Sequence, residues 1–195
     1  MQIIPTILEK EFFRAEERLQ LVKDLTSWVQ IDVVDGIFSP GKTFELELLN
    51  KVDIVKTFLW DIHLMVKDPI KWLEKCMFVG ASRVIGQVEM MENTDAFVQK
   101  AKDMGLEVGL AYNIDTQINK IPSETDLILL MGRKAGFERD EFNPKIFDKI
   151  NSDNIYAIDG GVDINNIELI EKSGIEIVYS GNSYLELIEK YANKN

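Results

Sequence analysis

The chain has 195 residues, 46% of them hydrophobic and 28% charged, which are proportions typical of one soluble globular domain. Its formal net charge of −11 argues against nucleic acid and anionic membrane surfaces as partners, because both attract clustered Lys and Arg. The single cysteine, Cys76, cannot form an internal disulfide, and no apolar stretch is long enough to span a bilayer. We therefore expect a cytoplasmic protein with a single domain over residues 1–195.

Apolar runs and amphipathic segments alternate from one end of the chain to the other. The runs are short and rich in β-branched and aliphatic residues, as in strands that are covered on both faces. The expected strands are Gln2–Leu8, Trp28–Val34, Thr57–Met65, Arg83–Glu89, Glu107–Asn113, Asp126–Met131, Ile155–Asp159 and Ile175–Ser180. The expected helices are Glu11–Leu25, Pro69–Val79, Thr94–Met104, Asn165–Ser173 and Ser183–Ala192. Residues 114–125 are too few for a full helix between two strands.

Eight strands that alternate with helices fit either a closed (β/α)8 barrel or an open, doubly wound sheet. No Gly-x-Gly-x-x-Gly follows the first expected strand, which disfavours the dinucleotide-binding form of the open sheet. Polar residues stand at the ends of several strands, and in a barrel all of these ends face one opening. We therefore predict an α/β protein, a (β/α)8 TIM barrel with short loops.

Three strand ends carry residues suited to chemistry. Asp32 lies near the end of the second strand, His63 near the end of the third, and Asp159 ends the seventh. Strand alternation places Gln30 on the same face as Asp32, and Asp61 on the same face as His63, and in a barrel that face can be the interior. A lone histidine is more often structural, and an aspartate at a strand end is as often a loop cap as a catalytic group, so at this point both interpretations stay open.

Two glycine-containing turns follow the last two strands. Gly160 and Gly161 come after the seventh, while Gly181 and Asn182 come after the eighth and lead into an expected helix. Glycine lets backbone N–H groups approach an anion closely, and a helix N-terminus favours negative charge. Turns in this order match the usual phosphate site of a TIM barrel, although either turn alone is an ordinary βα connection.

Further motifs lie between these points: Pro5-Thr6-Ile7-Leu8, Ile31–Gly36 with Phe38, Pro40, Thr43 and Phe44, Asp61–Val66 with Asp68 and Pro69, Gly109–Asn113, Leu130-Met131 and Asp159–Val162. Together they resemble the ribulose-phosphate 3-epimerase family over nearly the whole chain. The resemblance implies a barrel of the ribulose-phosphate-binding type. It also implies an isomerase that interconverts ribulose 5-phosphate and xylulose 5-phosphate with a divalent metal (Fe, Mn, Zn or Co).

By position, the resemblance implies that Asp32 and Asp159 are the catalytic acid/base pair and that both bind the metal together with His63. Gln30 stands where the family has a metal-binding histidine, and an amide oxygen is a poorer zinc ligand than imidazole. Implied contacts to a small sugar phosphate are Thr6, Met65, Met131, Gly136, Gly160, Gly161, Gly181 and Asn182. Because relatives often form dimers or larger rings, a homo-oligomer stays open.

The chain also departs from the family in the loop after the sixth strand. This loop usually reads Pro-Gly-Phe-Gly-Gly-Gln, whereas residues 135–140 read Ala-Gly-Phe-Glu-Arg-Asp. Arg133, Lys134 and Arg139 add positive charge there, which is either a different grip on the phosphate or a solvated surface cluster. On strand four, Gln87 stands in place of another family histidine.

These departures leave a second hypothesis, a barrel that binds a sugar phosphate without catalysis and serves as a binding or regulatory protein. A third, a sugar-phosphate lyase or decarboxylase on the same barrel, is disfavoured because such enzymes carry a lysine where Asp32 stands.

Overall fold

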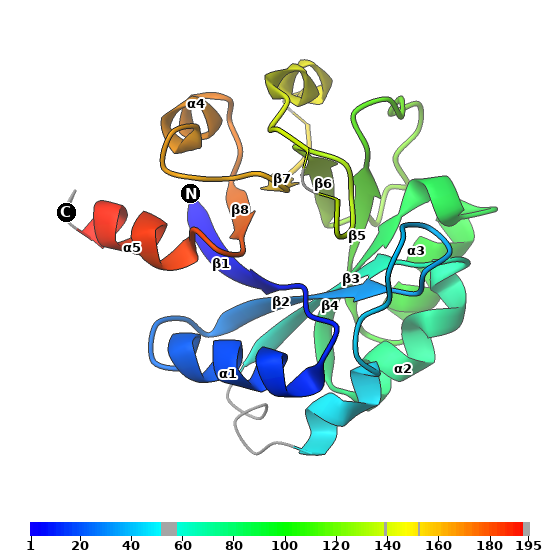
Figure 1. Cartoon of the computed structure of the whole chain (residues 1–195). Coiled ribbons are helices and arrows are strands. Elements are labelled where there is room, and N and C mark those ends of the chain that lie inside the picture. The colour runs from blue at the N-terminus through cyan, green and yellow to red at the C-terminus, as the bar shows by residue number, and fades with distance from the viewer. Residues whose placement is uncertain (52–57, 139, 152, 193–195) are drawn as a thin grey trace.

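Eight parallel strands form a closed barrel in the computed structural model, which describes residues 1–51, 58–138, 140–151 and 153–192. Each strand pairs with its neighbours in chain order, and β1 pairs with β8 to close the ring. The strands are β1 (Gln2–Ile7), β2 (Trp28–Val34), β3 (Leu59–Met65), β4 (Ala81–Gln87), β5 (Glu107–Tyr112), β6 (Leu127–Met131), β7 (Tyr156–Asp159) and β8 (Ile177–Ser180). The predicted TIM barrel is thus confirmed (Figure 1).

Helices fill most of the connections and surround the barrel (Figure 1). The α-helices are α1 (Phe12–Val22), α2 (Leu73–Phe78), α3 (Thr94–Asp103), α4 (Ile167–Lys172) and α5 (Tyr184–Ala192). Shorter 3₁₀ helices are η1 (Leu46–Lys51), η3 (Pro69–Trp72), η4 (Val88–Met90) and η5 (Pro144–Lys149). Within the described ranges, no helix is long and apolar enough to cross a membrane.

The predicted elements differ from the observed ones mainly at their ends. The expected single helix Pro69–Val79 is η3 followed by α2, and the strand expected to reach Glu89 ends at Gln87. Glu89 instead accepts hydrogen bonds from the Asn113 backbone N–H and the Thr116 hydroxyl, which hold the helix-free β5–β6 connection. Thr57, the expected first residue of the third strand, lies outside the described residues.

Apolar side chains pack on both sides of the barrel wall. Outside, the helices cover the strands, and α1 buries Ala15, Leu19 and Val22 along one face. Inside, a smaller cluster that includes Val34, Met65, Met131 and Tyr179 fills the barrel. Alternate residues of a strand point to opposite faces, so these inward residues mark the face that also carries Gln30, Asp32 and His63.

A buried ion pair lies inside the barrel at the level of Asp61. The Arg83 guanidinium donates to both Asp61 oxygens at 2.6 and 2.9 Å, and the Tyr179 hydroxyl donates to Asp61 at 2.6 Å. Burial raises the pKa of Asp61, and the contacts with Arg83 and Tyr179 act against this rise. Asp61 therefore lies on the predicted face but binds Arg83, and it does not join Asp32.

Replacing Arg83 by Met is expected to lower the free energy of unfolding by about 3–5 kcal/mol, because Asp61 keeps its burial and loses its countercharge. Denaturant unfolding at neutral pH measures this loss. Lys120→Met serves as the control, since it breaks the exposed Lys120–Asp95 pair and is expected to cost at most about 1 kcal/mol. Equal losses in the two variants would contradict the prediction.

Candidate functional site

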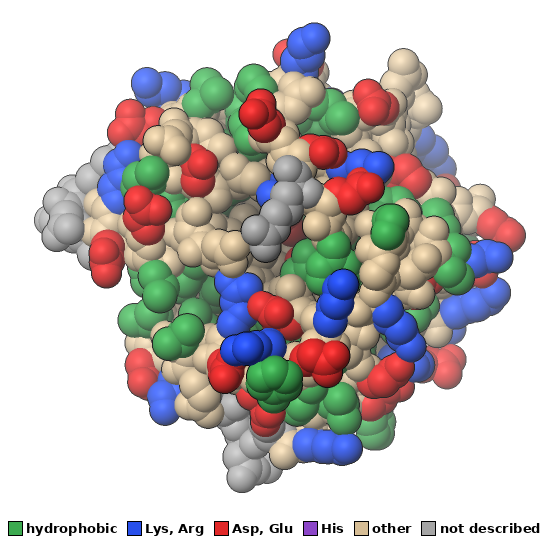
Figure 2. Space-filling model, viewed as in Figure 1, with side chains coloured by type: hydrophobic (Ala, Val, Ile, Leu, Met, Phe, Trp, Pro, Cys, Tyr) green, Lys and Arg blue, Asp and Glu red, His purple; other side chains and the backbone are tan. Residues whose placement is uncertain are grey.

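A cavity of about 540 Å³ opens where the strands end. Its lining includes ten of the predicted site residues: Thr6, Asp32, Met65, Met131, Gly136, Asp159, Gly160, Gly161, Gly181 and Asn182. The other two predicted residues, Gln30 and His63, are fully buried beside Asp32 and Asp159. On the face viewed in Figure 1, basic and acidic side chains lie interspersed near the centre (Figure 2).

The two predicted carboxylates meet at one amide nitrogen. Gln30 Nε2 donates to Asp159 Oδ2 at 2.7 Å and to Asp32 Oδ1 at 3.1 Å. It also lies 2.9 Å from Thr6 Oγ1, whose hydroxyl donates to Asp32 Oδ2 at 3.1 Å. Register explains this convergence, because Thr6 pairs with Gln30 across β1 and β2. Residues from β1, β2 and β7, far apart in sequence, therefore form one hydrogen-bonded group.

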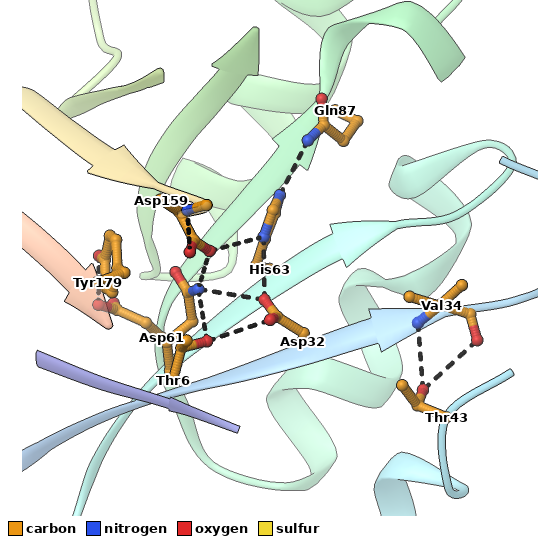
Figure 3. A network of polar contacts seen from close by, with 11 residues as sticks. Thr6, Asp32, Val34, Thr43, Asp61, His63, Gln87, Asp159 and Tyr179 are labelled. Carbon is orange, nitrogen blue, oxygen red and sulfur yellow. Dashed lines mark hydrogen bonds and ion pairs between the residues drawn. The ribbon is translucent and has the colours of Figure 1, made fainter. Parts of the chain in front are cut away.

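His63 stands on the other side of Asp32. It pairs in register with Asp32 across β2 and β3, and its Nδ1 lies 3.0 Å from Asp32 Oδ1 and 3.8 Å from Asp159 Oδ2. Its Nε2 contacts Gln87 Nε2 at 3.1 Å, so the imidazole is held between Gln87 and Asp32 (Figure 3). With Gln87 as donor, His63 carries its proton on Nδ1 and donates it to Asp32. Binding of a cation at Nδ1 requires the other tautomer, in which the proton is on Nε2 and the unpartnered Gln87 Oε1 is turned to accept it.

The carboxylate pair is electrostatically strained. Burial and the charge of Asp32 raise the pKa of Asp159 to about 7, although His63, Gln30 and the Gly160 N–H partly offset the rise. An acid whose pKa lies near neutrality holds and releases a proton with similar ease, which is the property of a general acid or base.

The donor set fits a divalent cation. One ligand atom from each of Asp32, His63 and Asp159 lies within 4.8 Å of the others, and all three residues are buried. Two carboxylates and an imidazole suit iron or manganese. Gln30 Oε1 is buried without a hydrogen-bond partner among the described residues. Rotation of this amide by half a turn would withdraw its N–H groups from the carboxylates and present an oxygen ligand.

The two predicted glycine turns line the same cavity. Gly160 and Gly161 have positive φ angles of 92° and 77°, a conformation that favours glycine. The Gly160 N–H donates to Asp159 Oδ1 at 2.6 Å, so it positions that carboxylate and is not free for an anion. In the other turn, the Asn182 side-chain oxygen accepts a hydrogen bond from Arg18 of α1 at 2.9 Å.

The loop after β6 packs against the loop after β2. A Cβ at Gly136, where φ is 104°, would lie 2.0 Å from Ser39 Oγ, and one at Gly41 would lie 2.7 Å from the Phe137 ring. Both contacts leave room only for glycine. The Lys10 ammonium stacks over the Phe137 ring at 5.2 Å, so the β1–α1 segment also contacts this loop. Arg139 lies outside the described residues.

Several residues of the site have no local sequence signal. Tyr179 lines the cavity and binds Asp61, and Arg18 reaches Asn182 from a helix. Strand alternation places Tyr179 on the same inward face as Gly181, two residues further on. Its hydrogen bond to Asp61 on β3, however, is visible only in the closed barrel. Nothing in the helix pattern distinguishes Arg18 from an exposed cation.

Residues 2–185 match the model described as the ribulose-phosphate 3 epimerase family. The chain is 31% identical over 193 residues to ribulose-phosphate 3-epimerase of Buchnera aphidicola subsp. Schizaphis graminum, covering 90% of this chain and 84% of that protein. It is 27% identical over 175 residues to that of Chlamydia pneumoniae, covering 82% of this chain and 76% of that protein.

Solved structures support the architecture alone, because their sequence identities are low. Phosphoribosyl anthranilate isomerase from Thermus thermophilus has a TM-score of 0.69 at 10% identity, covering 94% of this chain and 88% of that one. A 3-hexulose-6-phosphate synthase structure has a TM-score of 0.64 at 14% identity, covering 93% of this chain and 90% of that one.

Proposed function

The chain belongs to the ribulose-phosphate 3-epimerase family, and from this premise we propose that it interconverts ribulose 5-phosphate and xylulose 5-phosphate. The observation that carries the proposal is the approach of Asp32 and Asp159 to a single nitrogen, Gln30 Nε2, beside a cavity that two glycine turns also line. Family membership supports an epimerase, and the identity of its substrate as a ketopentose phosphate is our proposal.

Epimerisation inverts one carbon, so a proton must leave one face and return to the other. In our proposal, one of the two carboxylates, ionised, takes the proton from C3 of the sugar. The electron pair of the C–H bond moves to the C2 oxygen and forms an enediolate. The other aspartate, protonated, then delivers its proton to the opposite face of C3 as the carbonyl reforms. Asp159 with a pKa of about 7 is suited to either task at neutral pH.

Neighbouring side chains would orient the pair. Thr6 and Gln30 hold Asp32 and Asp159 by hydrogen bonds, and His63 holds Asp32 from the other side. A divalent cation held by Asp32, His63 and Asp159 would polarise the C2 carbonyl and offset the enediolate charge. Met65 and Met131, both buried at the cavity wall, would exclude water from the reacting carbon.

The direct test is turnover of ribulose 5-phosphate by chelator-treated protein refilled separately with Fe²⁺, Mn²⁺, Zn²⁺ or Co²⁺. We expect xylulose 5-phosphate with at least one of these ions. Absence of product with every ion, from folded protein whose metal content has been measured, would overturn the proposal.

One observation favours a second candidate, sugar-phosphate binding without catalysis. Gln30 directs N–H groups at both carboxylates and so replaces part of the role of a cation without supplying its charge. This candidate predicts that titration calorimetry detects ribulose 5-phosphate binding to the metal-free protein, while no deuterium enters the sugar from D₂O. Deuterium incorporation would exclude it.

A further inference from the structure

Arg133 differs from the other basic residues that line the cavity. Arg18 bonds to Glu9 and Asn182, Arg14 pairs with Glu17, and Lys134 pairs with Glu138. The half-buried Arg133 has no hydrogen bond or ion pair with any described residue. Lys10 also lacks an ion pair there, but its ammonium is occupied by the Phe137 ring.

The position of Arg133 is set by close packing on the first glycine turn. A Cβ at Gly160 would lie 2.8 Å from Arg133 Cγ and 3.2 Å from its backbone nitrogen. The aliphatic stem of Arg133 therefore lies against Gly160, because no side chain intervenes. This packing places Arg133 beside the first glycine turn, in the cavity that Gly161 and Gly181 also line.

Partial burial of an arginine without a polar partner costs free energy, because it removes water from the side chain and nothing replaces that water. The missing partner is notable in a chain with 33 acidic residues and a net charge of −11, where a carboxylate partner would be easy to supply. An anionic ligand with several acceptor oxygens would satisfy the guanidinium, and a phosphate presents such oxygens to it in pairs.

The glycine turn itself supplies fewer donors than its composition indicates. The Gly160 N–H is already bound to Asp159 Oδ1, which leaves that group unable to hold an anion. The overall negative charge of the chain also repels a phosphate dianion. A local positive charge would therefore contribute more to binding here than in a turn whose N–H groups are all free.

We propose that Arg133 binds the phosphate group of the substrate and makes the site selective for phosphomonoester dianions. This inference rests on the proposed function for the identity of the sugar, but the anion contact is separable from catalysis. It divides the basic cluster after β6: Arg133 contacts the ligand, whereas Lys134 is an exposed partner of Glu138.

The test compares Arg133→Ala and Arg133→Lys with Lys134→Ala, which removes the same charge one residue away. We expect Arg133→Ala to raise the KM for ribulose 5-phosphate about 10- to 100-fold with a smaller change in kcat, because charge-assisted hydrogen bonds to the phosphate are lost. Arg133→Lys should fall between wild type and Arg133→Ala, because it keeps the charge and loses the paired donors. Lys134→Ala should stay near the wild-type KM.

Binding of inorganic phosphate, followed by ³¹P NMR titration, separates this inference from the proposed function. If wild-type protein binds phosphate, Arg133→Ala binds it at least about tenfold more weakly and ribulose 5-phosphate is not turned over, then the contact stands and the epimerase proposal fails. If ribulose 5-phosphate is turned over but Arg133→Ala, folded by circular dichroism, keeps the wild-type KM and phosphate affinity, the contact is overturned. Equal losses of phosphate affinity in Arg133→Ala and Lys134→Ala would also overturn the contact, because they would show only a general effect of removing positive charge.

Discussion

Asp32→Asn and Asp159→Asn are each expected to lower kcat for ribulose 5-phosphate by about 10²- to 10⁴-fold, the usual contribution of a positioned acid or base. An asparagine keeps the size of the side chain but can neither accept the C3 proton nor return one. Steady-state assays at saturating metal measure the loss. The metal content of each variant must be determined in parallel, because both aspartates also belong to the cation donor set.

Asp35→Asn is the matched control for both variants. Asp35 follows β2 directly, and its carboxylate accepts backbone hydrogen bonds from Ile37, Phe38 and Lys67 in the adjacent loops. It does not line the cavity, so its replacement is expected to leave kcat close to the wild-type value. A wild-type kcat in either Asp32→Asn or Asp159→Asn would contradict the assigned roles.

The second large effect concerns stability in the metal-free protein. Asp159 has a pKa of about 7 in the folded state, against 3.8 as its ordinary value. Because the folded state holds the proton of Asp159 more tightly, the contribution of Asp159 to stability is greatest below about pH 4 and is lost as the pH rises through 7. The fall amounts to about 4 kcal/mol, from a shift of about three pKa units at 1.36 kcal/mol each.

Asp159→Asn removes this ionisation. The test measures the free energy of unfolding of both proteins in urea with a chelator. The value for the variant minus the value for wild type should rise by up to about 4 kcal/mol between pH 4 and pH 8. Excess Zn²⁺ should reduce the difference at pH 8, because a cation that binds only the folded wild type stabilises it. If the unfolding free energies of wild type and variant changed in parallel with pH, the raised pKa of Asp159 would be contradicted.

The barrel was accessible from sequence because its strands are buried on both faces and so appear as short apolar runs. Element ends were less accessible, since they depend on distant partners. Gln87 ends β4 earlier than the sequence indicates, where Glu89 turns to hold the β5–β6 connection. Likewise, the segment from Pro69 begins as a 3₁₀ helix and becomes α-helical only at Leu73.

The convergence of Asp32, His63 and Asp159 was predictable for a similar reason, because each lies at or near the end of a strand on one edge of a barrel. The details of the group were not. From sequence, Gln30 is only a replacement for a metal-binding histidine, whereas in the structure its amide nitrogen contacts both carboxylates. That contact depends on the relative positions of β2 and β7, which no local pattern records. The same holds for Arg133 and Lys134, which differ in the packing at Gly160 and in the ion pair of Lys134 with Glu138.

The most direct measurement of the central claim is deuterium exchange at C3, followed by ¹H NMR in D₂O with metal-loaded protein. If Asp32 and Asp159 serve opposite faces, wild type will label both ribulose 5-phosphate and xylulose 5-phosphate. Each asparagine variant will label only one of the two sugars, and a different one in each case. Conversion by wild type without labelling, or labelling of the same sugar by both variants, would contradict the account.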